Sequence, residues 1–206
     1  MQNILTFRIL ILLTVMYALP SLAQSYSGGS GTSGAPYQIA TVADLIYLSK
    51  TEAHWDKYFL QTADIIFDSD ETKVDWNNDG SADWSVADQL GFTPIGRGAY
   101  GAPKEFKAQY DGGNYIIKNL FINRNESIVL GTGVYDVGMF GYLGVSGVLK
   151  NIHLENVDIT AFNYTGTSQY YSAGALVGYI LSYLNPSPIL NCSSTGVVRG
   201  KQLLED

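Results

Sequence analysis

One short acidic segment carries the residue types and spacing of a calcium-binding loop. Oxygen-bearing side chains stand at every second position, and the set consists of Asp75, Asn77, Asp79, Ser81 and Asp83. Gly80 occupies the sixth position, where an EF-hand loop needs glycine for a sharp turn. Calcium takes about six to eight oxygen ligands, and alternate residues of a tight loop converge on one point. The segment therefore predicts a structural calcium site, with the Ser81 carbonyl as its seventh-position ligand.

The same segment has a second interpretation, as a solvated acidic turn. An EF-hand loop ends on a bidentate glutamate, but Val86 stands at that position here and has no oxygen in its side chain. Asp88, or Asp68 and Asp70 upstream, would have to complete the coordination. Aspartate, asparagine and glycine are also the residues of ordinary turns. The sequence leaves both interpretations open.

The other reactive side chains are few and show no catalytic pattern. His54 and His153 are the two histidines, and neither has metal-ligand spacing around it. We expect His153 on the outward side of a strand, in solvent. Cys192 is the single cysteine, which excludes an internal disulfide, and we expect a buried structural thiol. The prediction is a protein without catalytic activity of its own.

Composition favours short strands and tight turns. Only 15% of residues are charged, against about 25% in typical soluble domains. The chain contains 22 glycines and 15 tyrosines, which suit turns and strands better than helical bundles. The formal net charge is −7, and an acidic protein repels phosphate backbones. Nucleic acid is therefore not an expected partner.

The N-terminus has the features of an export signal. Arg8 precedes a largely apolar run, Ile9–Leu19, which is too short to span a bilayer. Ser21-Leu22-Ala23 then places small residues at the cleavage positions before Gln24. We predict a signal peptide over residues 1–23, an extracellular or cell-surface location, and no transmembrane segment in the mature chain. A retained membrane anchor is the alternative.

The segments that follow differ sharply in composition. Residues 24–36 are rich in glycine and serine and predict a flexible tether. Residues 37–206 form the predicted folded domain. Within it, Tyr58–Phe67 predicts a strand, and the polar, acidic residues 68–91 predict an insertion or long loop.

A short helix is expected at the start of the domain. Thr41 is a good N-cap, and Asp44 stands three residues later, as in a capping box. One apolar stripe follows at helical spacing, formed by Val42, Leu45, Ile46 and Leu48. The helix, from Thr41 to Lys50, is expected to cap one end of the domain.

Internal repetition decides the expected fold. Asn119–Ile122 recurs as Asn151–Leu154 and more faintly as Asn191–Ser194, at spacings of 32 and 40 residues. Val137–Tyr142 matches Gly174–Tyr179 at a spacing of 37 residues. Units this short cannot bury an apolar face alone, whereas stacking them about 4.8 Å apart joins their faces into one core. The repeats predict an all-β, parallel β-solenoid, and a β-sandwich is the alternative.

The strand pattern also predicts which side chains point inward. The period of two assigns a shared inward direction to Ile152, Leu154, Val157 and Ile159. His153 and Asp158 are expected to point outward. Tyr142 and Tyr179 are expected to stack at equivalent positions of successive units.

These repeats resemble the GLUG-repeat proteins of bacterial surfaces. The matching motifs are Phe106–Leu120, Val137–Tyr142, Lys150–Val157, Gly174–Tyr179 and Asn191-Cys192. The resemblance extends from Pro36 to Gly200. It implies a right-handed parallel β-helix (β-solenoid) and a secreted or surface location, and it supplies no catalytic residues to carry over.

Three functions fit these observations. The first is an adhesion or ligand-presenting module that binds a surface glycan or protein. The second is the N-terminal, non-catalytic part of a larger secreted enzyme such as a peptidase. The third is a β-helix polysaccharide lyase, for which the candidate basic residues are Arg97, Lys104 and Lys107.

The C-terminal end of the predicted solenoid has no candidate cap. Asn191-Cys192 begins another repeat strand, and the sequence stops soon after Gly200. An open terminal coil exposes unpaired backbone groups. We therefore expect further repeats or a second domain beyond Asp206, or self-association through the uncapped coil.

Overall fold

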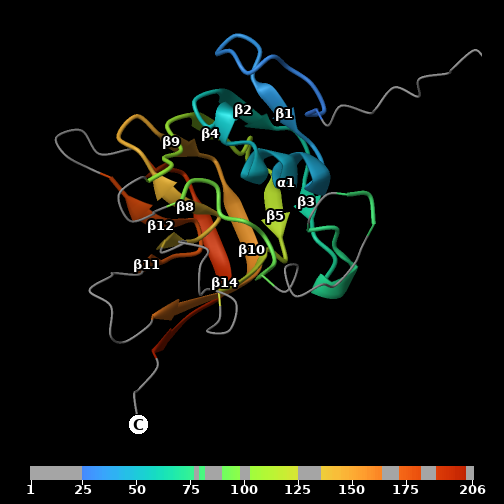
Figure 1. Ribbon diagram of the computed structural model, residues 1–206. Coiled ribbons are helices and arrows are strands. Elements are labelled where there is room, and N and C mark those ends of the chain that lie inside the picture. Colours follow the sequence, from blue (N-terminus) through green and yellow to red (C-terminus); the bar gives the residue numbers. More distant parts are fainter. Residues whose placement is uncertain are drawn as a thin grey trace, which may run out of the picture.

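The computed structural model describes residues 25–76, 79–81, 90–97, 103–124, 136–163, 172–181 and 189–202 (Figure 1). Strands dominate this part of the chain. Its helical elements are α1 (Val42–Lys50) and two single 3-10 turns, η1 (Glu52–His54) and η2 (Glu71–Lys73). The predicted all-β class is confirmed.

The described residues form four sheets in which every named strand pairs in parallel. The first sheet has the order β1 (Tyr37–Ile39), β2 (Tyr58–Gln61), β4 (Gln109–Asp111), β9 (Val148–Lys150), β13 (Ile189–Leu190). The second has the order β3 (Ile65–Ile66), β5 (Ile116–Lys118), β10 (His153–Asn163), β14 (Ser193–Gln202), with β6 (Phe121–Asn123) also beside β10. The two-stranded sheets join β7 (Asp136–Val137) to β11 (Ser172–Ala173) and β8 (Phe140–Leu143) to β12 (Val177–Ile180).

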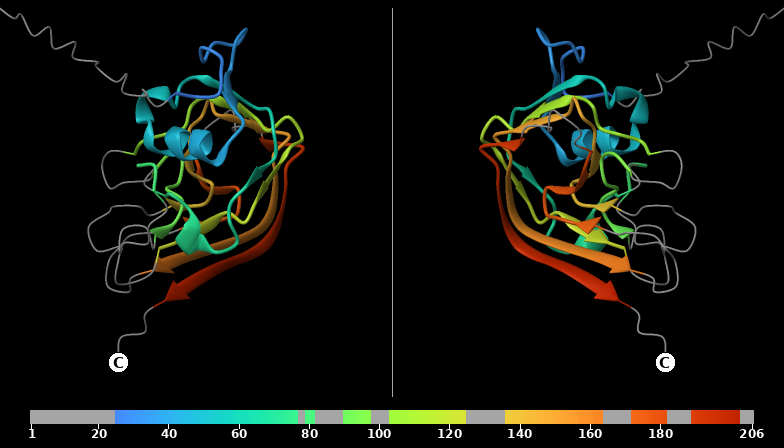
Figure 2. Two further views of the ribbon diagram at one scale, coloured as in Figure 1. Left: turned by 90° about the vertical axis from the view of Figure 1, so that its right-hand side faces the viewer. Right: turned by 90° about the vertical axis from the view of Figure 1, so that its left-hand side faces the viewer.

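From β4 onward the chain returns to the same sheet at nearly constant intervals, whereas the preceding return, from Phe59 to Tyr110, is longer. In the first sheet Tyr110 lies beside Leu149, and Leu149 lies beside Ile189. The fourth sheet repeats with the predicted spacing, because Tyr142 pairs with Tyr179. The third sheet departs from it by one residue, because Val137 pairs with Ala173 rather than with the predicted Gly174. Figure 2 shows β10 and β14 following one curve side by side. We call each such pass of the chain a coil.

Aromatic side chains fill the space between the sheets. Phe59, Phe106, Tyr110 and Phe140 are at most 1% exposed. The ring centroids of Phe106 and Phe140 lie 4.9 Å apart, and those of Tyr110 and Phe140 lie 5.7 Å apart. Rings at these separations bury large apolar areas, and Tyr110 and Phe140 also attract each other edge to face.

Helix α1 covers the end of the core beside β1. Thr41 is its N-cap, and the Thr41 side chain and the Asp44 carboxylate form the predicted capping box. Leu45, Ile46 and Leu48 are buried as predicted, while Val42 is only partly buried. The Trp55 indole N–H donates to the Leu48 carbonyl at 2.9 Å, which ties the helix to the following turn.

The segment predicted to be a flexible tether is folded against the domain from residue 25 onward. Tyr26 is 8% exposed, and the Gln38 N–H donates to the Gly28 carbonyl at 2.8 Å. Gly29 has φ +81°, and a Cβ there would lie 1.8 Å from the Pro36 carbonyl oxygen. Glycine is therefore needed for a tight turn rather than for flexibility, and the tether prediction is wrong for these residues.

The predicted strand Tyr58–Phe67 is two strands, β2 and β3, with a corner between them. The corner is built around Gln61, which is 1% exposed. Its side-chain amide donates to the Ala63 carbonyl at 2.9 Å and to the Ile116 carbonyl at 3.0 Å. A buried polar side chain that satisfies backbone acceptors turns the chain, which an apolar pattern cannot reveal.

The predicted match between Asn119 and Asn151 is wrong by five residues. The Asn114 N–H donates to the Asn151 carbonyl, and β10 lies on β5 in the register that puts these two asparagines side by side. Asn119 lies instead beside Asn156. The coils of β5 and β10 each have two asparagine corners, so the sequence comparison matched the second corner of one coil to the first corner of the next. The spacing between Asn151 and Asn191 is confirmed.

The inward and outward directions are confirmed. Ile152, Leu154, Val157 and Ile159 are at most 3% exposed, and Asp158 is exposed. His153 is partly exposed and forms its hydrogen bonds at the surface. The described residues contain no helix that is both long and apolar enough to cross a membrane.

Candidate functional site

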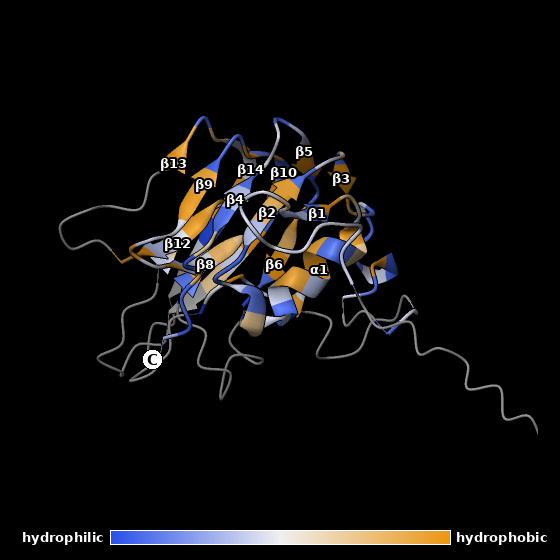
Figure 3. Ribbon diagram, turned by 90° about the horizontal axis from the view of Figure 1, so that it is seen from above, coloured by the Kyte–Doolittle hydropathy of each residue, from blue (hydrophilic) through white to orange (hydrophobic). Residues whose placement is uncertain are grey.

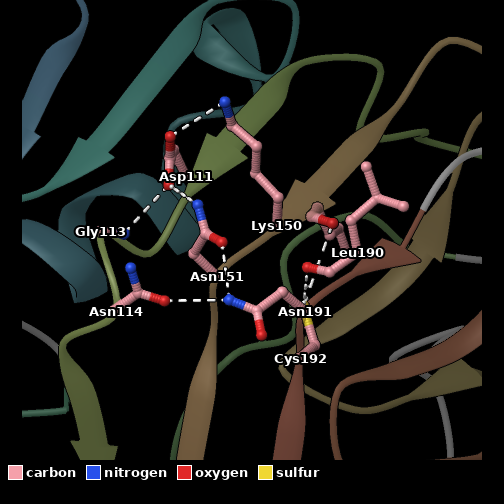
Figure 4. A network of polar contacts seen from close by, with 9 residues as sticks. Asp111, Gly113, Asn114, Lys150, Asn151, Leu190, Asn191 and Cys192 are labelled. Carbon is pink, nitrogen blue, oxygen red and sulfur yellow. Dashed lines mark hydrogen bonds and ion pairs between the residues drawn. The ribbon is translucent and has the colours of Figure 1, made fainter.

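A ladder of stacked asparagines lies at one corner of the coils (Figure 4). Asn114, Asn151 and Asn191 have φ of 62°, 55° and 50°. This left-handed conformation is unfavourable for most side chains, and asparagine tolerates it best after glycine. The Asn191 amide donates to the side-chain oxygens of Asn151 at 2.9 Å and Asn114 at 3.0 Å. We call these three residues the asparagine ladder.

A charged pair closes one side of the asparagine ladder. The Asn151 amide donates to the Asp111 carboxylate at 2.9 Å, and Lys150 Nζ lies 3.0 Å from the same carboxylate. Partial burial alone would raise the pKa of Asp111. Hydrogen bonds from the Asn151 side chain and the Gly113 N–H, together with Lys150, outweigh burial, so the pKa of Asp111 is lowered. The carboxylate is therefore held ionised as a structural acceptor.

The coils of β5 and β10 have a second asparagine corner, which is built in the same way. Asn119 and Asn156 have φ of 59° and 51°. The Asn156 amide donates to the Asn119 side-chain oxygen at 2.9 Å, and the Asn119 amide donates to the Phe67 carbonyl at 3.0 Å. Beside this corner lies a groove of about 210 Å³ with acidic walls, lined in part by Asp68, Glu71 and Asp158.

His153 and Cys192 are held in contacts between coils. His153 Nδ1 lies 2.9 Å from the Ser193 hydroxyl, and Nε2 lies 3.4 Å from the Asn114 side-chain oxygen. Cys192 takes the inward position of Ile152. It is only half-buried, not buried as expected, because no described strand covers the coil of β14. Burial raises the pKa of the Cys192 thiol, which disfavours the nucleophilic thiolate.

The basic residues considered for a lyase are paired with carboxylates. Arg97 forms an ion pair with Glu52 and lies 5.9 Å from the centroid of the Trp55 ring. Lys104 Nζ lies 3.7 Å from the other Glu52 oxygen. The third candidate, Lys107, lies 3.4 Å from Glu105. The two contacts of Glu52 join segments that are distant in the sequence, whereas Lys107 and Glu105 belong to one segment.

One buried cation was missed by sequence reasoning. Arg124 is 3% exposed, and its guanidinium donates to the Leu90, Phe92 and Asn123 carbonyls. Burial lowers the pKa of Arg124 to about 10. Arginine in a polar stretch after a strand carries no signal for burial, so only the structure shows that it fastens residues 90–92 to β6.

Only part of the predicted calcium loop lies in the described residues. The Asp75 carboxylate accepts the N–H groups of Asp79 at 3.1 Å and Gly80 at 2.8 Å, and Gly80 has φ +97°. The Asp79 carboxylate accepts the Ser81 N–H at 3.0 Å. Asn77 and Asp83 lie outside the described residues. Among those described, no group of three histidine, cysteine, aspartate or glutamate residues is arranged to hold a metal ion. Calcium binding stays a prediction.

Calcium is expected to raise the melting temperature of the protein. A cation that binds only the folded loop stabilises it by mass action. Asp79→Ala is expected to abolish this gain, while Asp56→Ala, an exposed carboxylate near η1, is expected to leave it intact. Thermal melts with calcium or a chelator measure the effect. An unchanged melting temperature up to millimolar calcium would favour the solvated-turn interpretation.

An aromatic cluster attaches the N-terminal segment to the cap. Tyr26 packs on Tyr37 and Tyr47, with ring centroids 4.4 and 5.0 Å apart, and its hydroxyl lies 3.1 Å from His54 Nδ1. Desolvation, and to a lesser degree the charge of Lys57, lowers the pKa of His54. The unfolded chain, with a histidine pKa of about 6.5, therefore binds a proton more readily than the folded protein.

Acidification is accordingly expected to loosen this attachment. The stabilising effect of neutral His54 is fully present above the unfolded pKa and is lost as the pH falls below it. Hydrogen exchange of residues 25–38 at pH 7 and pH 5 measures the change, and faster exchange is expected at pH 5 beyond the intrinsic effect of pH. His54→Gln should remove the excess, and His153→Gln serves as the control. An equal excess in the His54→Gln protein would show that His54 is not responsible.

Comparisons with known proteins give two similarities. The chain is 32% identical over 172 residues to halomucin from Haloquadratum walsbyi; the match covers 84% of the chain but 2% of halomucin. A candidate immunoglobulin A1 protease from Bacteroides ovatus has a similar crystal structure, with a TM-score of 0.50, 20% identity, and coverage of 84% of this chain and 41% of that one. No protein-family model matches the chain. At this identity the structural likeness concerns the fold alone.

Proposed function

We propose that the chain is an exported, cell-surface repeat scaffold that presents a binding surface to a glycan or protein and catalyses no reaction itself. In this proposal the four sheets are the faces of a right-handed parallel β-helix of the GLUG type. The observation that carries it is the constant register between coils: Asn114, Asn151 and Asn191 stack at one corner, and Tyr142 stacks on Tyr179 with ring centroids 5.0 Å apart. Such repetition builds an extended surface rather than a single reactive cleft.

The use of the reactive side chains supports a scaffold. His153, Asp111 and Lys150 are engaged in hydrogen bonds or ion pairs that join one coil to another. Arg97 and Lys104 share the carboxylate of Glu52. An enzyme needs a nucleophile, base or cation directed at substrate, whereas these groups are directed at their neighbours in the fold.

The predicted signal peptide and the similarity to halomucin support an extracellular location. Residues 1–23 lie outside the described residues, so export rests on the pattern of the sequence. The chain matches only a small share of halomucin, which fits a module that also occurs within much longer proteins. Sequencing the N-terminus of the protein from its native cells tests export: Gln24 or its pyroglutamate is expected, and an intact Met1 would contradict it.

Binding is tested with the exported protein on arrays of surface glycans and extracellular proteins. We expect saturable binding that survives the substitutions Arg97→Gln and Lys107→Gln, with no release of unsaturated sugar products. Binding that is absent from every array would contradict the adhesion role. Product formation that depends on Arg97 or Lys107 would establish the lyase instead.

The alternative is a non-catalytic part of a larger secreted enzyme such as a peptidase. This alternative is supported by the likeness to the Bacteroides ovatus structure, of which this fold covers 41%. In that case the full reading frame encodes a catalytic domain, and the scaffold has no role beyond positioning the substrate for it.

A further inference from the structure

We propose that residues 25–36 protect the free edge of β1 and thereby prevent a second copy of this chain from pairing with it. We call this segment the N-terminal strap. Figure 1 shows it in blue, beyond β1 at one end of the molecule. This role is independent of the ligand of the scaffold, because it concerns one end of the stack rather than its faces.

Strand β1 would have an unpaired side without the strap. It lies at one end of the first sheet, in which Figure 3 shows β13, β9, β4, β2 and β1 side by side in this order. On the side of β1 away from β2, Gly28 and Gln38 form an antiparallel bridge, in which the Gln38 N–H donates to the Gly28 carbonyl at 2.8 Å. An open strand edge is a template for pairing with another chain. The strap therefore takes the place that another strand would otherwise fill.

The strap turns back on itself and does not offer a new strand edge in place of β1. The Ser30 N–H donates to the Ala35 carbonyl at 2.9 Å, and the Ala35 N–H donates to the Thr32 carbonyl at 3.2 Å. The Gly31 carbonyl accepts the N–H of Tyr58, the first residue of β2, at 3.0 Å. These backbone groups are paired within the strap or with the sheet that it covers. The run of parallel strands therefore ends at the strap.

Tyr26 anchors the strap in the core. The strands place Tyr37 beside Phe59, and the ring centroid of Tyr26 lies 4.4 Å from that of Tyr37 and 5.6 Å from that of Phe59. The Ser27 hydroxyl donates to the Asp44 carboxylate at 2.7 Å, which is the carboxylate of the capping box of α1. The strap is thus joined to the helix as well as to β1, and it covers apolar rings as well as backbone groups.

Two glycines of the strap provide a matched pair for a test. Gly29 has φ +81°, and a Cβ there would lie 1.8 Å from the Pro36 carbonyl oxygen. A side chain at this position must displace the strap, because the atom that it meets belongs to the backbone. Among the described residues, a Cβ at Gly34 would meet no atom within 4 Å. The same substitution at Gly34 therefore adds the same side chain without displacing the strap.

Analytical ultracentrifugation of the protein at micromolar concentration tests this role. Gly29→Val is expected to have a greater mass than the wild type, by at least one further copy of the chain, and the mass should rise with concentration. Gly34→Val should keep the mass of the wild type. Tyr26→Ala, which removes the anchor without a backbone clash, should also associate. Circular dichroism identifies the folded variants, and Tyr26→Ala keeps the test valid if Gly29→Val does not fold.

The double variant Gly29→Val/Gln38→Pro locates the association at β1. Proline has no N–H to donate to another strand and is tolerated at a free strand edge, so this variant should return to the mass of the wild type. Folded Gly29→Val and Tyr26→Ala proteins that both keep the mass of the wild type would overturn the proposal. An equal gain of mass in Gly34→Val, or a gain that persists with Gln38→Pro, would overturn it as well.

Discussion

Replacing Ile152 by aspartate is expected to unfold the domain. Ile152 is 0% exposed and belongs to the continuous core. A buried carboxylate without a partner destabilises a protein by about 4 kcal/mol or more, and a domain of this kind has only about 5–15 kcal/mol in total. Circular dichroism should show loss of the strand signal, or a urea midpoint shifted far below that of the wild type.

His153→Asp is the matched control, since it introduces the same side chain one residue later on the opposite face. His153 is partly exposed, and its hydrogen bonds to Ser193 and Asn114 are at the surface. We expect a change of about 1 kcal/mol or less. Equal stabilities for Ile152→Asp and His153→Asp would show that the inward register is wrong.

Asn151→Ala is expected to destabilise the protein by about 2–4 kcal/mol. Asn151 has φ 55°, and alanine in the left-handed region costs about 1–2 kcal/mol more than in its preferred conformation. The substitution also removes the amide that donates to Asp111 and the oxygen that accepts from Asn191. Each lost hydrogen bond contributes about 1 kcal/mol. Urea unfolding measures the sum.

Asn151→Gly separates the two causes. Glycine adopts the left-handed conformation without a Cβ penalty but cannot bridge the coils. We expect it to be more stable than Asn151→Ala by about 1 kcal/mol and still less stable than the wild type. If both variants matched the wild type, the asparagine ladder would contribute nothing to stability.

Local patterns in the sequence predicted the parts of the fold that depend on neighbouring residues. The capping box of Thr41 and Asp44 and the alternation around Ile152 each need only a few adjacent positions, and both are confirmed. The 37-residue spacing between Tyr142 and Tyr179 is also confirmed, because the glycines around it make that motif distinctive.

Features that depend on contacts across coils were not predictable. The asparagine motif occurs twice in the coils of β5 and β10, so its sequence cannot tell Asn114 from Asn119 as the neighbour of Asn151. The glycine-rich start was interpreted as flexible because composition does not show that Tyr26 packs on Tyr37. For the predicted calcium loop, the turn was predictable, because Asp75 and Gly80 form it as expected. Calcium binding itself stays a prediction, since Asn77 and Asp83 lie outside the described residues.

Cysteine cross-linking between coils tests the stacked, parallel architecture most directly. Ile116 and His153 are neighbours in the register of β5 and β10, and the spacing of adjacent strands suits a disulfide. In a Cys192→Ser background, Ile116→Cys/His153→Cys should therefore oxidise rapidly to a disulfide without loss of stability. Phe121→Cys/His153→Cys, the pairing implied by matching Asn119 to Asn151, should stay reduced. Rapid oxidation of the second pair and not the first would contradict the register, and no cross-link in either would contradict the stacked coils themselves.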